Sequence, residues 1–171
     1  MNRPRLYYLI TLLAGGVLLL LDRLSKLWVL DRLELYESLT PLPTLAPFFR
    51  ILHTTNTGVA FGLFRDGGAL FALIAAVAVV VMLIYSLRMD TRSPLAYLGM
   101  GLLVGGASGN LWDRLVYGHV IDFLDFRLSQ ALSWPTFNVA DMGVVVGVFL
   151  FMWVIYAEER QGGEVAASPS P

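Results

Sequence analysis

The sequence contains no cysteine and only two histidines, His53 and His119. The absence of cysteine excludes disulfide bonds, thiolate metal sites and a cysteine nucleophile. Charged residues are also scarce, at 15% of 171 residues, whereas a soluble globular domain has about 25%. So few charges leave too little polar surface to cover a water-exposed protein, and the composition therefore favours a membrane protein. The net charge of -1 gives no indication of nucleic-acid binding.

Four long apolar stretches dominate the chain, at approximately 6–30, 67–87, 95–116 and 139–157. A helix needs about 20 mostly apolar residues to cross the bilayer core, and each stretch is close to that length. The second stretch carries no charge, although a helix of a soluble bundle would need a polar side. We therefore expect an all-α membrane protein with four transmembrane helices, formed by a single domain over residues 1–171.

The predicted topology places both chain ends on the cytoplasmic side. The first stretch follows two arginines like a signal peptide, but Leu21, Asp22 and Arg23 stand where a cleavage site needs small residues, so we expect a retained anchor. An even number of crossings puts both termini on one side, and basic residues favour the cytoplasm. Those residues are Arg3, Arg5, Arg88, Arg92 and Arg160. The Gly, Ala, Ser and Pro-rich tail, about 161–171, is expected to be disordered.

Polar residues gather where the spans approach the predicted outer face, and polar groups inside a membrane are candidates for function. Asp22 and Lys26 are four residues apart, so they share a helix face and can form an ion pair. The segment 56–62 begins with Asn56 and is rich in small residues, which suits either a tight loop turn or a site. This segment alone does not distinguish the two.

The end of the third stretch combines glycines with a polar cluster. Gly101, Gly105 and Gly109 recur every fourth residue, a pattern typical of close helix packing in membranes. A polar cluster follows on one helix face, because its members are spaced by three and four residues: Asn110, Asp113 and Arg114. Three polar side chains beside lipid require partners or a cavity.

Two acids lie near the two ends of the second outer segment, about 117–138. Asp122 lies near its start and Asp141 opens the last span, so the loop can bring them together. Two neighbouring carboxylates in a medium of low dielectric constant do not both ionise, and one retains a proton. Such a pair can activate water and protonate a leaving amine. Asp22, Asp113 and Asp125 are alternative acids at this point of the argument.

The five polar blocks, taken in order, resemble those of the lipoprotein signal peptidases (signal peptidase II), a family of bacterial membrane aspartic peptidases. The blocks are 22–26, 56–62, 105–114, 120–123 and 137–141, and the resemblance covers about residues 6 to 158. It implies removal of signal peptides from diacylglyceryl-modified prolipoproteins, with cleavage just before the lipidated cysteine. It also implies a site at the outer face of the bacterial cytoplasmic membrane and no metal or other cofactor.

The resemblance also assigns roles to residues. It makes Asp122 and Asp141 the catalytic pair. It places four residues around the substrate: Asn56, Asn110, Arg114 and Asn138. It gives a supporting structural role to Asp22, Lys26, Gly106 and Asp113. The first outer segment, about 31–66, would form a small β-rich cradle and a short helix covering the substrate, around residues 41–49. Because a complete site fits within one chain, we expect a monomer whose partners are the substrate and membrane lipid.

Two other functions remain open. Residues 106–109 fit the GxSG pattern of intramembrane serine peptidases, with Ser108 as nucleophile, but a serine needs a base within reach. The only histidines, His53 and His119, lie outside the predicted spans. A small transporter or channel that relays protons through its acids is the other alternative. It would need a polar path through the membrane, and the second span offers no ionisable residue.

Overall fold

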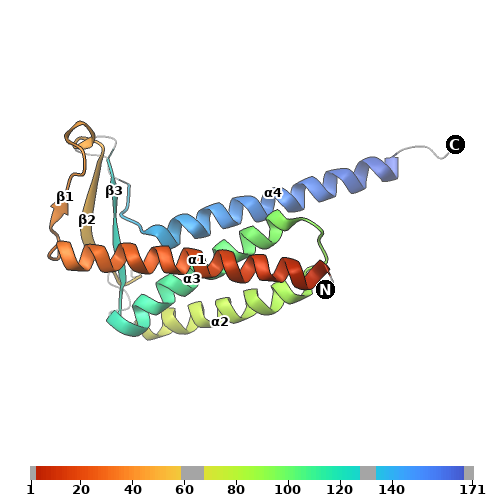
Figure 1. Ribbon diagram of the computed structural model, residues 1–171, viewed down its shortest axis with the longest axis horizontal. Coiled ribbons are helices and arrows are strands. Elements are labelled where there is room, and N and C mark those ends of the chain that lie inside the picture. The colour runs from red at the N-terminus through yellow and green to blue at the C-terminus, as the bar shows by residue number, and fades with distance from the viewer. Residues whose placement is uncertain (1–2, 59–67, 128–133, 168–171) are drawn as a thin grey trace.

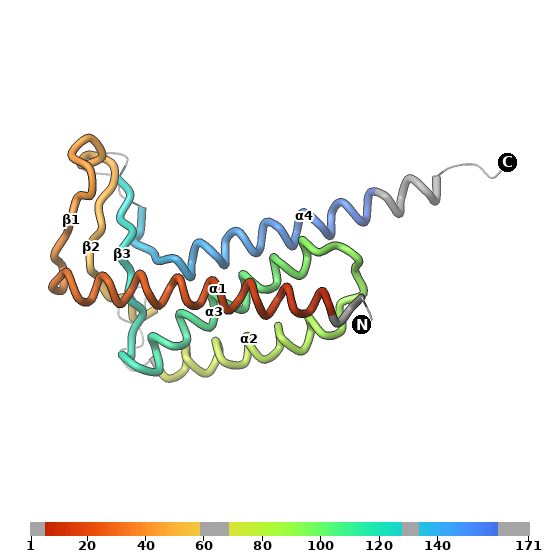
Figure 2. The backbone as a smooth tube through the Cα atoms, viewed as in Figure 1, coloured from red at the N-terminus to blue at the C-terminus, as the bar shows by residue number. Residues whose placement is uncertain are grey.

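The structure is a computed structural model that describes residues 3–58, 68–127 and 134–167, with side chains for residues 6–58, 69–127 and 134–160. Its four helices are α1 (Arg3–Arg32), α2 (Gly68–Arg88), α3 (Pro94–Tyr117) and α4 (Val139–Ala167). Helix α3 contacts each of the other three. A small sheet stands across one end of the helices, whereas α1 begins and α4 ends at the opposite end (Figures 1 and 2).

Each predicted apolar stretch coincides with one helix. Three helices are long and apolar enough to cross a membrane: Leu6–Arg32, Ala69–Arg88 and Val139–Arg160. Helix α3, with 24 residues, is not among them. It is the helix enclosed by the others, so glycines at its contacts and polar residues at its end replace some of the apolar side chains that lipid would favour. Membrane helices are therefore confirmed, and the crossing by α3 remains a prediction.

Glycines allow α3 to approach α1 and α4 at backbone distance. A Cβ atom added to Gly105 would lie 2.5 Å from the carbonyl oxygen of Gly15 on α1. A Cβ atom on Gly106 would overlap the carbonyl oxygen of Ala140 on α4. Backbone atoms cannot rotate away as the end of a side chain can, so the helices would have to separate. Gly106 thus fixes the position of the start of α4, which carries Asp141.

Gly106→Ala should lower the free energy of unfolding by about 1–3 kcal/mol, the usual effect of overpacking. The opposing gain in helix propensity from glycine to alanine is about 1 kcal/mol. Gly16→Ala on α1 is the matched control, because nothing lies within 4 Å of its added Cβ. Thermal unfolding in detergent should show a lower Tm for the first variant only. Equal Tm values for the two variants would contradict this packing argument.

The sheet contains three antiparallel strands in the order β1 (Ser38–Leu39), β2 (Phe49–Asn56) and β3 (Val120–Phe126). The first two come from the first outer segment, as a β-rich cradle would require. The third comes from the second outer segment, which the sequence analysis did not predict to be a strand. Its run of valine, isoleucine and phenylalanine is typical of strands, and the two acids within it obscured that pattern. The register between β2 and β3 shifts between Ile51 and Thr54.

The sheet is attached to the bundle by an apolar contact with the end of α1. Val29 on α1 and Leu33, the residue after α1, are buried against Phe123 on β3. In the first outer segment the only helical element among the described residues is the three-residue 3-10 helix η1 (Pro43–Leu45). Its residues are all exposed, and a covering role over the substrate remains a prediction.

Helix α4 is longer than the last apolar stretch predicts. It continues to Ala167, so its backbone is helical over residues 161–167, where the composition predicts disorder. Extending an existing helix costs much less than starting one, and the alanines and glutamates near this end favour it. Residues 168–171 of the predicted disordered tail lie outside the described residues.

Candidate active site

The polar blocks meet where the sheet joins the helices. Asn56 ends β2, Asp122 lies in β3, Asn110 lies in the last turns of α3, and Asp141 lies in the first turn of α4. All four are linked by hydrogen bonds through Asn138, the residue before α4. Residues 59–62 of the second block lie outside the described residues. The structure therefore brings together four of the five blocks directly and, as shown below, the first block through Asn110.

Asn138 and Asp141 form a capping box at the start of α4. The side-chain oxygen of Asn138 accepts a hydrogen bond from the backbone N–H of Asp141, at 2.9 Å. The Asp141 carboxylate accepts one from the backbone N–H of Asn138, at 3.1 Å. Reciprocal bonds of this kind satisfy two N–H groups that a helix start leaves free. The cap fixes the backbone and side chain of Asp141 in one position.

Asn138 also reaches the second acid. Its amide nitrogen donates to Oδ1 of Asp122 at 2.7 Å, and also contacts the Oδ1 atom of Asn110 at 3.1 Å. The amide nitrogen of Asn110 donates to Oδ1 of Asp141 at 2.7 Å. Two asparagines therefore connect the two carboxylates, and Asn138 is fully buried. Only one orientation of each amide group satisfies all these bonds.

Asn56 holds the other oxygen of Asp122. Its amide nitrogen donates to Oδ2 at 3.0 Å, and its own oxygen accepts from the N–H of Gly58 at 2.8 Å. In the β2–β3 register Asp122 lies opposite Thr54, so Asn56 is its diagonal neighbour on the same sheet face. Gly58 has a φ of 76°, a left-handed conformation that glycine adopts without strain. This turn fixes the orientation of the Asn56 amide.

Burial raises the pKa of Asp122 to about 6 from its ordinary value, and the negative charge of Asp141 adds to this effect. The hydrogen bonds from Asn56 and Asn138 favour the ionised carboxylate and oppose the increase. Asp122 therefore retains a proton at a pH where an exposed aspartate is ionised. A carboxylic acid of this kind can donate a hydrogen bond to a substrate.

The first polar block, residues 22–26, contributes a buried ion cluster that contacts the site residue Asn110. Lys26, which is fully buried, contacts Asp22 at 2.8 Å and Asp113 at 2.7 Å. Its ammonium group also donates to Oδ1 of Asn110 at 3.1 Å. Because this oxygen accepts from Lys26, the other end of the Asn110 amide is turned toward Asp141.

The two carboxylates of this cluster are tied to other elements. Asp22 accepts from the backbone N–H of Ala140 at 3.0 Å, at the start of α4. Asp113 accepts from the backbone N–H of Ile121 at 3.1 Å and pairs with Arg23. The cluster thus joins α1, α3, β3 and α4 immediately beside both site acids.

Comparison with known proteins identifies the family of this chain. Residues 14–157 match the family model described as signal peptidase (SPase) II. The chain belongs to the signal peptidase II family. It is therefore a protease, and a protein of the bacterial membrane.

Similar proteins include lipoprotein signal peptidases of three bacteria. The relative from Halothermothrix orenii is 37% identical over 147 residues, which are 85% of this chain and 94% of the relative. That from Thermodesulfovibrio yellowstonii is 39% identical over 80% of this chain and 88% of its own. That from Rhodopseudomonas palustris is 38% identical over 82% and 88%.

Two solved structures of bacterial membrane enzymes share the fold. Each has a TM-score of 0.75. The first is 22% identical and covers 94% of both chains, and the second is 23% identical and covers 85% of this chain and 91% of its own. At these identities the likeness concerns the fold alone.

In this signal peptidase II fold, the alternative acids Asp22, Asp113 and Asp125 form ion pairs with lysine or arginine side chains. Asp125 lies three residues after Asp122, so the two side chains leave opposite faces of the strand. Its carboxylate pairs with Arg50 at 2.5 Å and Arg127 at 3.1 Å. Asp22 and Asp113 belong to the Lys26 cluster. Among the described side chains, Asp122 and Asp141 form no ion pair and are held by amides instead.

Arg114 is half-buried and lies near Asp122 and Asp141. One of its terminal nitrogens donates to the backbone oxygen of Asn110 at 3.1 Å. Its Nε atom is buried and has no partner among the side chains that the structure describes. The remaining donors of the guanidinium group can face a substrate carbonyl.

The serine alternative lacks a base. His53 is buried and contacts the carbonyl oxygen of Leu33 at 2.9 Å. His119 lies against the ring of Tyr117. No hydrogen bond joins Ser108 to either histidine, and all three residues are described. Among the described residues there is also no group of three His, Asp or Glu side chains that could hold a metal ion.

An apolar groove begins at Asp141. It has a volume of about 440 Å³, and besides Asp141 it is lined by Trp134, Phe137, Met142, Val145 and Val146. An apolar chain can therefore lie directly beside the carboxylate of Asp141. The sequence analysis did not identify this groove, because Trp134 and Phe137 precede α4 and only the fold brings them over its first turns.

Proposed function

We propose that this protein removes the signal peptide from diacylglyceryl-modified prolipoproteins, with Asp122 and Asp141 as the catalytic pair. The observation that carries the proposal is the position of Asn138, which donates to one carboxylate and caps the helix of the other. Lipoprotein signal peptidases of several bacteria, which are 30–39% identical to this chain, support the substrate class.

Asp122 carries the shared proton and Asp141 is the base. Burial favours the neutral form of Asp122, whereas Asp141 lies in the first turn of a helix, where the dipole favours a negative charge. Asp141 takes a proton from water, the water oxygen bonds to the scissile carbonyl carbon, and Asp122 gives its proton to the carbonyl oxygen. When the C–N bond breaks, Asp141 protonates the leaving amine and Asp122 recovers its proton.

The surrounding amides position this pair. Asn138 and Asn110 keep the carboxylates in fixed orientations, and neither has an amide nitrogen free of the network. Asn56 is exposed, and Arg114 has guanidinium donors outside this network, so they are the residues we assign to contact with the substrate backbone. In this assignment Asn138 and Asn110 act on the substrate through the two acids, although the family resemblance places them around it.

The family resemblance supports a membrane arrangement with the site at the outer face. The four helices cross the bilayer, α3 included, with both termini in the cytoplasm and the sheet at the outer face. A signal peptide helix enters from the lipid, and the groove at Met142 and Val145 receives apolar substrate beside Asp141. Binding in the membrane makes the encounter with the site effectively intramolecular.

A cleavage assay tests the proposed function. The purified protein in detergent is mixed with a diacylglyceryl-modified prolipoprotein, and the shorter product is followed by its shift on a gel. An unlipidated precursor is the control. Cleavage of the lipidated precursor alone supports the proposal, whereas no cleavage by a folded sample alongside an active relative contradicts it.

Activity should decrease as the pH rises above the pKa of Asp122. Because Asp122 must hold its proton, kcat/KM should fall about tenfold for each pH unit above a pH of about 6. Asn56→Leu removes a hydrogen bond that favours the ionised carboxylate, so this basic limb should move to higher pH. Thr55→Val, on the opposite face of β2, is the control and should leave the limb unchanged. An unmoved limb in Asn56→Leu would rule out Asp122 as its origin.

A further inference from the structure

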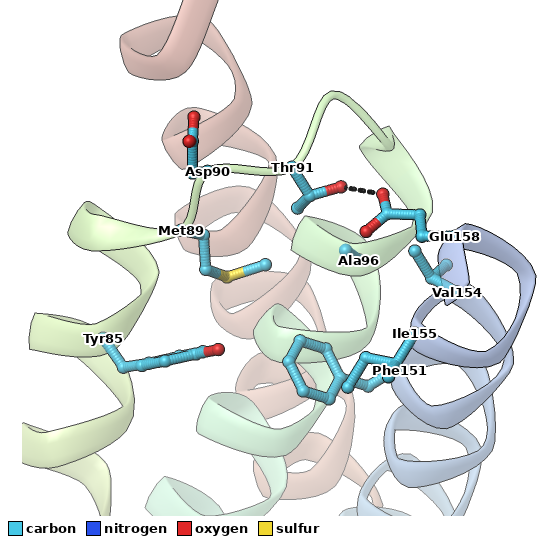
Figure 3. Close-up of a pocket in the computed structure, with 9 residues that line it drawn as sticks. All are labelled: Tyr85, Met89, Asp90, Thr91, Ala96, Phe151, Val154, Ile155 and Glu158. Atoms are coloured by element: carbon cyan, nitrogen blue, oxygen red, sulfur yellow. Dashed lines mark hydrogen bonds between the residues drawn. The ribbon is translucent and has the colours of Figure 1, made fainter. Parts of the chain in front are cut away.

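A second cavity lies at the other end of the bundle, away from the catalytic pair. It has a volume of about 190 Å³ and is formed where the link between α2 and α3 meets α4. The rings of Tyr85 on α2 and Phe151 on α4 meet edge-on in its wall, at 6.3 Å between centroids. Met89 and Ile155 add further apolar surface (Figure 3). The signal peptidase chemistry does not use this cavity.

Two carboxylates line this cavity beside its apolar residues. Glu158 accepts a hydrogen bond from the hydroxyl group of Thr91, and Asp90 is also part of the lining (Figure 3). Neither acid forms an ion pair among the side chains that the structure describes. The guanidinium group of Arg160, two residues further along α4, lies instead over the ring of Tyr156. An aromatic and apolar wall that includes a carboxylate suits a lysine or arginine side chain, which can bury its stem and pair its charged end.

One residue of the cavity wall, Ile155, lies on the same side of α4 as Asp141. Residues 141, 148 and 155 are seven apart, so they are nearly aligned along the helix. Val148 and Ile155, on this side of the helix, are both exposed. Glu158 lies 17 residues after Asp141, which corresponds to about 25 Å along the axis and about 100° around it, on the side where Ile155 borders the cavity. A chain that binds at Asp141 and follows α4 therefore arrives at the cavity.

The distance fits a signal peptide. Such a peptide has a basic segment followed by about 7–15 apolar residues. A helical apolar segment of about 12 residues is about 18 Å long, and two extended residues before the cleavage site add about 3.3 Å each. The basic segment then lies about 25 Å from the scissile bond, level with Glu158.

We propose that this cavity binds a basic side chain from the N-terminal segment of the signal peptide, with Glu158 as the ion-pair partner. The inference rests on the proposed function and extends it to a second contact between enzyme and substrate. Because the contact is remote from the reacting atoms, it contributes to KM and leaves kcat unchanged.

The test compares two substrates and two variants. One diacylglyceryl-modified prolipoprotein keeps the lysines of its N-terminal segment, and the other carries glutamine in their place. Glu158→Gln retains an acceptor for Thr91 while removing the charge. Glu159→Gln, an exposed neighbour pointing elsewhere on α4, is the matched control. Cleavage is measured at low ionic strength, where surface charges are least screened.

Glu158→Gln should raise KM about threefold for the lysine substrate, the effect of losing one exposed ion pair. It should leave KM for the glutamine substrate and both kcat values unchanged, and Glu159→Gln should change neither substrate. This inference alone is overturned if Glu158→Gln changes KM equally for the two substrates or leaves both KM values unchanged. It is also overturned if Glu159→Gln raises KM for the lysine substrate as much as Glu158→Gln does. If the unaltered enzyme cleaves neither substrate, the proposed function falls, and this inference with it.

Discussion

Asp141→Asn should reduce cleavage of a lipidated prolipoprotein by on the order of 10³-fold or more, because the variant cannot accept a proton from water. The fold should survive the change. The new side chain keeps an oxygen that can accept from the backbone N–H of Asn138, so the capping box can form. The product on a gel reports activity, and thermal unfolding in detergent reports stability. Asp122→Asn should have a comparable effect, because it cannot give a proton to the carbonyl oxygen.

Asp125→Asn provides the matched control for these variants. It makes the same change from carboxyl to amide on the strand that carries Asp122, three residues away and on the opposite face. The two arginines that pair with Asp125 are partly exposed, and water can hydrate them when the carboxylate is lost. Cleavage should remain within about fivefold of the unaltered protein. Full activity in Asp141→Asn, or an equal loss in Asp125→Asn, would contradict the assignment of the pair.

The sequence predicts the helices well because a membrane places one strong requirement on them. A span must be apolar over about 20 residues, and this is a local property of the chain. The crossing by α3 is the exception, and its reason is also physical. A helix enclosed by protein needs small residues for close contact more than it needs apolar area, so its composition gives a weaker signal.

The site was predictable in its residues but not in its connections. The family resemblance predicts Asp122, Asp141 and Asn138 as site residues, and the structure brings these residues together. That Asn138 is both the helix cap and the link between the acids depends on β3 being a strand, which places Asp122 beside the start of α4. Likewise, the role of Lys26 in orienting Asn110 depends on how α1 and α3 pack, and no sequence pattern encodes that distance.

Lys26→Met should produce the largest loss of stability in the chain. The variant keeps the length and volume of the side chain but leaves two buried carboxylates, Asp22 and Asp113, without their shared cation. Removing one partner of a buried ion cluster costs about 3–5 kcal/mol. The free energy of unfolding should fall by this amount in a detergent unfolding titration. Unchanged stability would show that the cluster contributes no net binding between the helices.

The double variant Asp22→Asn/Lys26→Met separates the loss of the ion pair from the loss of shape. An amide at position 22 can still accept from the backbone N–H of Ala140, and Asp113 still pairs with Arg23. The double variant should therefore be more stable than Lys26→Met, because one unpaired buried charge has been removed together with its cation. Activity should recover less than stability, since neither variant restores the contact between Lys26 and Asn110 that orients the amide toward Asp141. If stability and activity recover to the same degree in the double variant, Lys26 acts on the catalytic pair only by holding the helices together.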